Sequence, residues 1–277
     1  MAKRLISAGV GIVIGVSILI FDNLFVYCAA ICFFSAVAVW ELTRAIKCEK
    51  LTVLRWSSIV MGAVYPAVMI IDWANFLILP VSMGYVLLMA LVMLKCHKEV
   101  RFEQVLACGA AGGLLPVALS SIILLRYSEC GKDLGIFMLL YLLFCAWFGD
   151  SGAYFAGTFF GKHKLCPEIS PKKTVEGLIG GIVTTSVIFV VFNAIYINLI
   201  SKEGLHANYI LLALAGAVCA LIGTLGDLSA SMIKRQCGIK DYGNIMPGHG
   251  GMMDRFDSVL FVMPTFYAFL SVMDIYK

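Results

Sequence analysis

Long apolar stretches separated by short polar segments are the main pattern of this 277-residue sequence. A helix needs roughly 20 apolar residues to cross the ~30 Å hydrocarbon layer of a bilayer. The stretches that approach or meet this length are residues 5–21, 24–40, 57–71, 75–94, 105–125, 136–160, 178–200, 208–233 and 258–275. The period-two alternation typical of β-strands is missing, and in lipid a helix pairs all its backbone polar groups internally. The pattern therefore predicts an all-α integral membrane protein, a polytopic bundle of about nine transmembrane helices.

Two of these stretches allow a second interpretation. The third is short, and only residues 72–75 separate it from the fourth, so the two could form one segment. The first follows "MAKR" and is similar to a signal peptide, but no small-residue cleavage site followed by a polar domain comes after it. We therefore expect residues 5–21 to be a retained helix.

Composition supports the membrane assignment, and the distribution of charge predicts the orientation. Hydrophobic residues make up 61% of the chain and charged residues 14%, against about 25% charged residues in soluble domains. With nine spans, 17 of the 21 Lys and Arg residues fall on the side of the N-terminus, which places that side in the cytoplasm. The net charge of +4 is thus spread over one membrane face and does not indicate nucleic-acid binding. The 10 cysteines lack zinc-site spacing, and we interpret most of them as packing residues.

The chain divides into two regions of different character. Residues 1–135, with about five helices, carry no motif, and we interpret them as an N-terminal transmembrane scaffold. Residues 136–277, with about four helices and two cytoplasmic loops, hold two acids inside apolar stretches, Asp150 and Asp227. A carboxylate inside a span costs at least about 2.5 kcal/mol on insertion scales, which makes such residues functional candidates. Residues 136–277 are therefore the predicted catalytic region.

One face of the eighth stretch carries three polar groups. Asp227, Ser231 and Lys234 are spaced i, i+4 and i+7, which aligns them on a helix. A carboxylate in the membrane, a hydroxyl and a cation at the cytoplasmic mouth suit a site for a metal ion and phosphates. The alternative for Asp227 is a single intramembrane salt bridge to another helix.

Two further acids, Asp254 and Asp257, stand three residues apart where the ninth stretch begins. This spacing predicts one helix face, on which two carboxylates repel unless a positive charge lies between them. Carboxylate oxygens are the ligands that Mg²⁺ selects, with waters and substrate phosphates completing its shell. Asp227, Asp254 and Asp257 are therefore the predicted metal ligands. Alternatively, the two later acids only favour a helix N-terminus through its dipole.

The segment "MPGHGG" at residues 246–251, just before these acids, is rich in glycine. Gly248, Gly250 and Gly251 can adopt positive φ and let backbone N–H groups approach a ligand closely, so this loop and the following helix N-terminus predict a phosphate cradle. His249 could donate to a phosphate or carry a proton. The other polar residues of this region that we predict to bind substrate are Arg235, Lys240, Asp241 and Arg255.

The loop after the sixth stretch, residues 161–177, contributes a second cationic element. Lys172 and Lys173 follow the stiff "ISP" segment and belong to the same predicted membrane face as the glycine-rich loop. Taken alone, such a lysine pair is a common feature of cytoplasmic loops. On the sixth stretch, Asp150 and Tyr154 are spaced i, i+4, and we expect them to face the same bundle interior.

These residues carry a resemblance to a known family. The segment "SMIKRQCGIKDYGNIMPGHGGMMDRFDS" at 231–258 resembles the signature of phosphatidate cytidylyltransferases, also called CDP-diacylglycerol synthases. That signature reads S-x-x-K-R, then K-D, then H-G-G-x-x-D-R-x-D. The segments "DSGAYFAGTFFGKHKL" and "ISPKKTVEG" are similar to a second block of the family. The length and the number of spans also fit, so the resemblance covers the whole chain.

The resemblance implies a nucleotidyltransferase that converts CTP and phosphatidate into CDP-diacylglycerol and diphosphate in phospholipid biosynthesis. It implies a multi-pass homodimer in the inner or plasma membrane, with an active site that faces the cytoplasm and membrane lipid around it. Asp227, Asp254 and Asp257 match the acids of a two-metal centre that holds Mg²⁺ and a second cation, divalent or K⁺. Ser231 and Lys234 belong to the same element and are expected to touch phosphates. The predicted catalytic residues are Asp227, Lys234, Asp254 and Asp257.

Two other functions remain open on the sequence alone. A CTP-dependent transferase could act on another lipid phosphate, such as an isoprenoid one, because the pocket for the lipid tail leaves no legible pattern. An ion-coupled transporter could also use intramembrane acids. A transporter, however, gives no reason for a glycine-rich loop suited to polyphosphate at the membrane surface.

Overall fold

The computed structural model describes residues 2–21, 23–48, 51–70, 76–127, 132–200, 205–248 and 250–276, and most of them are helical. The helices are α1 (Ala2–Phe21), α2 (Leu24–Ala45), α3 (Thr52–Ile70), α4 (Ile78–Lys95), α5 (Phe102–Arg126), α6 (Lys132–Phe160), α7 (Val175–Ile195), η2 (Tyr196–Ile200, a π-helical continuation of α7), α8 (Tyr209–Gln236), α9 (Met253–Phe256) and α10 (Val259–Val272). Each predicted apolar stretch coincides with a helix, which confirms the helical membrane fold.

Seven helical segments are long and apolar enough to cross a membrane within the described parts of the chain. They are α2, α4, α5, α6, α7 with η2, α8, and the segment Met253–Val272 that contains α9 and α10. The first and third predicted spans, which became α1 and α3, do not belong to this set. The number of nine spans and the cytoplasmic N-terminus therefore stay predictions.

A small β-hairpin follows α6, where the sequence predicted only a loop. Strand β1 (Lys164–Cys166) pairs antiparallel with β2 (Ser170–Thr174). The carboxylate of Glu176, in the first turn of α7, accepts hydrogen bonds from the backbone N–H of His163 at 3.2 Å and from its ring Nδ1 at 2.7 Å. This contact ties the start of the hairpin to the helix that follows it. Strands of three and five residues are too short to show the alternation by which strands are recognised in a sequence.

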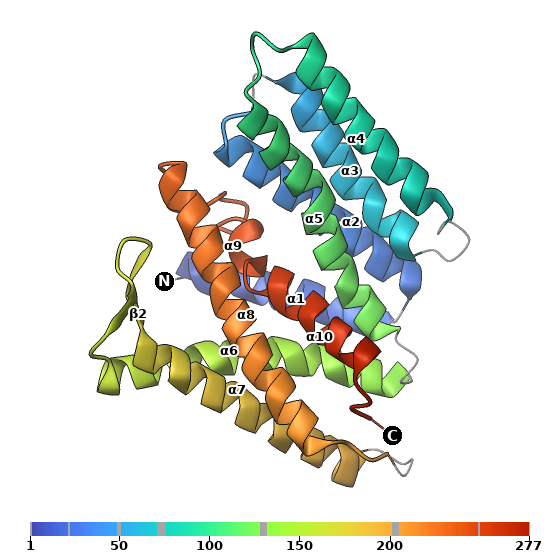
Figure 1. The fold of residues 1–277 in the computed structure, drawn as a ribbon. Coiled ribbons are helices and arrows are strands. Elements are labelled where there is room, and N and C mark those ends of the chain that lie inside the picture. Colours follow the sequence, from blue (N-terminus) through green and yellow to red (C-terminus); the bar gives the residue numbers. More distant parts are fainter. Residues whose placement is uncertain are drawn as a thin grey trace. The chain divides into compact units, whose positions relative to one another are not determined.

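The chain forms two compact units, and they do not follow a linear division at residue 135. The first unit consists of Met1–Ile123 and Lys234–Phe256. Within it, α2 packs against α3 and α3 packs against α4 (Figure 1). A Cβ atom added to Gly62 on α3 would lie 2.9 Å from Cγ2 of Val39 on α2, so a side chain at that position would force the two helices apart.

The second unit consists of Leu124–Ile233 and Asp257–Lys277. Helices α6 and α7, joined by the hairpin, run antiparallel and pack along their length (Figure 1). Small residues permit this close approach: a Cβ atom added to Gly177 on α7 would lie 2.8 Å from the carbonyl oxygen of Ala153 on α6. Close packing of small residues is a common way to join helices in a membrane, where apolar burial between helices gains little.

Farther along these helices, aromatic side chains replace the small residues. The ring centroids of Tyr141 on α6 and Phe189 on α7 lie 4.5 Å apart, and those of Phe189 and Phe266 on α10 lie 5.5 Å apart. All three side chains are fully buried. In the second unit, α6 and α7 therefore pack through small residues near the hairpin and through aromatic rings farther along.

Candidate active site

The carboxylate of Asp254 on α9 organises the glycine-rich loop in the first unit. Its Oδ1 accepts a hydrogen bond from Nζ of Lys234 at 2.8 Å, and its Oδ2 accepts from the backbone N–H groups of Tyr242 at 2.8 Å and Gly251 at 2.9 Å. The side chain of Asp254 is only 4% exposed and that of Lys234 13%. Charge-assisted bonds of this kind are about twice as strong as neutral ones, and so one acid holds both ends of the loop.

The loop turns tightly where the sequence predicted a phosphate cradle. The backbone N–H of Met246 donates to the carbonyl oxygen of Gly250 at 3.0 Å. Gly250 has a φ of 85°, and a Cβ atom there would lie 2.8 Å from Oδ2 of Asp254, so both the backbone and the acid require glycine. The predicted positive φ is confirmed at this position. His249, within the turn, lies outside the described residues.

Glu41 is a site residue that the sequence analysis missed, because it was assigned to the scaffold. This acid on α2 is fully buried. Its two carboxylate oxygens accept the backbone N–H groups of Met252 at 3.0 Å and Met253 at 2.8 Å. A Cβ atom at Gly243 or Gly251 would collide with this carboxylate.

One sequence signal could have identified Glu41. It lies near the C-terminal end of α2, where the helix dipole disfavours an acid, in an otherwise apolar segment. A carboxylate at such a place needs donors from elsewhere, and here the donors are the N–H groups at the start of α9. Glu41 and Asp254 thus fix the same loop from two elements.

Asp227 and Lys173 form the charged centre of the second unit. Lys173, near the end of β2, makes an ion pair with Asp227 on α8. The two side chains are 29% and 36% exposed, so the pair stays accessible from outside the protein. The salt bridge considered as an alternative for Asp227 therefore exists, but its partner lies on the hairpin and not on another helix. The hydroxyl of Thr174 accepts the N–H of Gly177 at 3.0 Å, which caps α7 and fixes the end of β2.

Asp150 on α6 belongs to the same charged group. It lies near enough to Lys173 and Asp227 to interact with both electrostatically. The ion pair of this group is the one between Lys173 and Asp227, and Asp150 adds a second carboxylate to the same neighbourhood.

Asp257 occupies a different element from the one that its spacing predicted. The helix breaks after Phe256, so Asp254 lies in α9 while Asp257 lies in the turn before α10. Oδ1 of Asp257 accepts the backbone N–H of Ser258 at 2.8 Å. Its carbonyl oxygen lies 2.8 Å from where a Cβ atom of Gly226 would be, so the backbone of Asp257 lies beside the residue that precedes Asp227.

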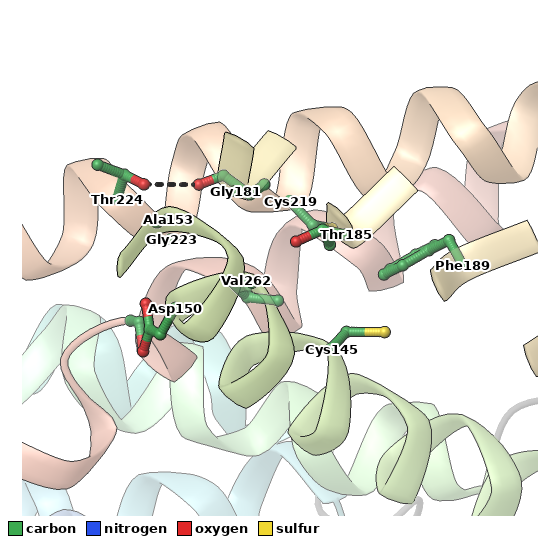
Figure 2. Close-up of a pocket in the computed structure, with 13 residues that line it drawn as sticks. Cys145, Asp150, Ala153, Gly181, Thr185, Phe189, Cys219, Gly223, Thr224 and Val262 are labelled. Atoms are coloured by element: carbon green, nitrogen blue, oxygen red, sulfur yellow. Dashed lines mark hydrogen bonds between the residues drawn. The ribbon is translucent and has the colours of Figure 1, made fainter. Parts of the chain in front are cut away.

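A pocket opens among α6, α7, α8 and α10 within the second unit (Figure 2). Asp150 and Gly149 line it from α6, Thr185 and Phe189 line it from α7, and Val262 lines it from α10. The wall also includes Cys145, Cys219, Thr224 and Ser258. The pocket therefore combines a carboxylate, hydroxyl groups and an apolar surface.

The remaining predicted residues lie at the protein surface or at its edge. Ser231 is half-buried on α8, one helical turn after Asp227. Those with exposed side chains are Tyr154, Lys172, Arg235, Lys240, Asp241 and Arg255. Tyr154 is 69% exposed, so the prediction that it faces the bundle interior is wrong. The exposure of the other five is compatible with contact to a soluble substrate.

The fit of these residues to a metal ion differs between the acids. Within the described residues of either unit, no three His, Cys, Asp or Glu side chains form a group suited to a metal. Asp227 has an accessible carboxylate, 36% exposed, whose ion-pair partner is Lys173. Asp254, in contrast, already accepts three hydrogen bonds. Its predicted role as a metal ligand stays a prediction.

Cys237 stands in the sequence between the end of α8 and the glycine-rich loop. Burial raises the pKa of the Cys237 thiol, an effect that nearby Lys47 only partly offsets. A thiol with a raised pKa stays protonated near neutral pH, and the thiolate is the nucleophilic form. The chemistry of this region therefore depends on its charged groups.

Comparison of the sequence with known proteins identifies a matching family and several relatives. Residues 2–273 match the model of the Cytidylyltransferase family. The phosphatidate cytidylyltransferase of Bacillus subtilis (strain 168) is 47% identical over 138 residues, which are 50% of this chain and 49% of that protein. The protein of the same name from Haemophilus influenzae is 43% identical over 135 residues, 49% of this chain and 46% of the relative. That of Staphylococcus haemolyticus is 36% identical over 195 residues, 70% of this chain and 69% of the relative. The chain spans about half the length of the first two relatives.

Proposed function

Because the chain belongs to the cytidylyltransferase family, we propose that it transfers the cytidylyl group of CTP to phosphatidate, releasing diphosphate and forming CDP-diacylglycerol. The proposal rests on the positions and contacts of the motif residues in the structure. Asp254 fixes the glycine-rich loop, and Asp227 pairs with Lys173 near a largely apolar pocket. A nucleotide and a lipid phosphate need these two kinds of environment.

The reaction needs little proton transfer. A phosphate oxygen of phosphatidate attacks the α-phosphorus of CTP, a new P–O bond forms, and the bond to the bridging oxygen of diphosphate breaks. The attacking phosphate is already an anion near neutral pH, so a strong general base is not required. The main barrier is the approach of two anions, and positioned cations lower it.

The proposed roles of the cationic residues follow from their exposure. Lys173 is positioned beside Asp227 and can exchange this contact for a phosphate. Lys172, Lys240 and Arg255 have exposed side chains that can meet the polyphosphate of CTP. Lys234 donates one of its three hydrogens to Asp254, and the others remain available to a phosphate oxygen. The N–H groups of Gly251, Met252 and Met253 are already bonded to Asp254 and Glu41, so the predicted phosphate cradle does not use them as donors.

We propose Mg²⁺ as the cofactor, with Asp227 and Asp257 as its first protein ligands and Asp254 as the third predicted one. The ion would neutralise phosphate charge and stabilise the leaving diphosphate. The accessible carboxylate of Asp227 supports a cation there. A second cation, divalent or K⁺, remains a prediction from the sequence, as does the homodimer.

The protein has several helices that can span a membrane. We propose that this is the inner or plasma membrane and that the charged centre faces the cytoplasm. CTP is a cytoplasmic solute and phosphatidate is a membrane lipid, so an enzyme for both must work at that surface. The basic loops predicted on the cytoplasmic side support this orientation.

Purified protein in detergent, supplied with CTP and Mg²⁺, tests the proposal. We expect diphosphate release only when phosphatidate is added, and loss of release when a chelator removes the metal. Release with an isoprenoid phosphate but not with phosphatidate would assign the enzyme to another lipid. If no lipid phosphate supports release, the transferase proposal is wrong and an ion-coupled transporter becomes the better explanation.

A further inference from the structure

The hydroxyl of Thr185 is buried without a hydrogen-bond partner among the described residues. The side chain lies on α7, is 4% exposed, and lines the pocket of the second unit. A buried hydroxyl without a partner is costly, so each such group in a pocket indicates something that completes it. A threonine usually avoids this cost by bonding a carbonyl one turn back along its helix, and Thr224 on α8 does so by donating to Ala220 at 2.9 Å (Figure 2).

The opposing helix leaves space for this hydroxyl. A Cβ atom at Gly149 on α6 would lie 2.6 Å from Oγ1 of Thr185, so any larger residue there would cover the hydroxyl. Gly149 and Thr185 both line the pocket (Figure 2). The structure therefore presents a donor to the cavity.

The pocket changes in character along α6 and α7. At one level Ala153 faces Gly181, and one turn farther Gly149 faces Thr185. Asp150 lies between these two levels on α6, and Thr224 of the pocket wall lies one turn before Asp227, the partner of Lys173, on α8. One turn beyond Thr185 the pocket is lined by Phe189. Thr185 thus occupies the boundary between the charged end and the apolar end.

This order matches the order of groups in a diacyl lipid phosphate. Such a lipid carries an anionic phosphate, then ester carbonyls a few bonds away, then hydrocarbon chains. We infer that Thr185 donates a hydrogen bond to an ester carbonyl of the lipid substrate, while the phosphate lies toward Lys173 and the acyl chain toward Phe189. The inference rests on the proposed function and names a residue that selects an ester lipid.

The test compares phosphatidate with its ether-linked analogue, which has the same phosphate and chain length but no carbonyl acceptors. In the wild type we expect a KM for the ester lipid about three- to tenfold below that for the ether lipid, the range of one ordinary hydrogen bond. Thr185→Val, which removes the hydroxyl at nearly constant volume, should raise the ester KM to the ether value. Its KM for CTP and its kcat should stay at wild-type values.

Two control variants keep the test interpretable. Thr184→Val changes the adjacent threonine, whose hydroxyl lies beside Gly152 and which does not line the pocket, so it should keep the ester preference. Thr185→Ser retains a hydroxyl and should also keep it, even if Thr185→Val folds poorly. A wild type that does not distinguish the lipids overturns the inference, as does an undiminished ester preference in Thr185→Val or a lost one in Thr185→Ser. If the wild type turns over neither lipid, the proposed function itself fails and the inference falls with it.

Discussion

Two buried carboxylates decide the shape of the glycine-rich loop at the scale of single residues. Glu41 and Asp254 together accept four backbone N–H groups within residues 242–253, and Asp254 also accepts Lys234. Backbone donors that are buried must be paired, and a loop of glycines offers few internal partners. The acids therefore replace the hydrogen bonds that a helix or strand would supply.

Glu41→Gln is expected to weaken the loop although it keeps the size of the side chain. The amide presents an NH₂ group where the carboxylate accepted an N–H, so one backbone donor is left unpaired in a buried place. We expect a loss of about 2 kcal/mol or more, the cost of an unpaired buried donor plus a weakened charge-assisted bond. Thermal melting in detergent measures this loss. Glu103→Gln, at an exposed acid on α5, serves as the control, and equal melting of the two variants would contradict the role of Glu41.

Asp254→Asn is expected to lower stability and activity together. It removes the charge that pairs with Lys234 and replaces one acceptor oxygen by a donor facing N–H groups. We expect the rate of diphosphate release to fall about 10²-fold or more and the melting temperature to fall as well. An Asp254→Asn protein that melts like the wild type but is inactive would show that Asp254 acts on the substrate or metal and does not hold the loop.

At the scale of elements, small residues let α6 and α7 approach each other and bring the hairpin to α8. Thr174 caps α7 and ends β2, and its neighbour Lys173 pairs with Asp227. A Cβ atom at Gly157 on α6 would lie 2.9 Å from the hydroxyl of Thr174. The packing of the two helices thus determines where Lys173 is held.

Gly157→Ala tests this packing. The added methyl group should push α6 from the start of α7 and disturb the cap, at a cost of about 1–3 kcal/mol despite the better helix propensity of alanine. Gly84→Ala on α4 is the matched control, because nothing lies within 4 Å of its added Cβ atom and alanine there should be neutral or stabilising. Thermal melting separates the two, and a Gly157→Ala protein as stable as Gly84→Ala would contradict the close approach.

The hydrophobic pattern of the sequence predicted the helices. It did not predict the features that depend on local strand pairing or on tertiary contacts. Each apolar stretch forms a helix because a helix pairs all the backbone N–H and C=O groups of a single segment in lipid. The strands at 164–174 are too short to show alternation, and the helix predicted to carry both Asp254 and Asp257 breaks after Phe256. Glu41 was missed because its partners lie 211 and 212 residues away.

At the scale of the whole molecule, each of the two compact units is built from two separate segments of the chain. Lys234–Phe256, which carries the loop and Asp254, belongs to the same unit as Met1–Ile123. Asp227, Asp150 and Lys173 belong to the other unit. The motif residues could be found from the sequence because the resemblance is dense there. Their division between two units could not, because it depends on which helices pack together.

The charge distribution predicts which loops share a membrane face. In a variant without native cysteines, single cysteines replacing the exposed Lys98, Lys164 or Lys240 should react with a membrane-impermeant thiol reagent only from the cytoplasmic side. A cysteine replacing the exposed Asn208, just before α8, should react only from the opposite side. Labelling of Lys98 and Lys240 positions from opposite sides would refute the nine-span topology.

The central claim is that Asp227, beside Lys173 and Asp150, lies where the nucleotide joins the lipid phosphate. Transfer of label from α-³²P-labelled CTP into the lipid fraction measures it most directly, with wild type, Asp227→Asn and the exposed control Asp274→Asn compared at equal protein. We predict a fall of at least about 10²-fold for Asp227→Asn, because a stabiliser of transition-state charge is lost, and none for Asp274→Asn. Incorporation by Asp227→Asn at close to the wild-type rate would contradict the account.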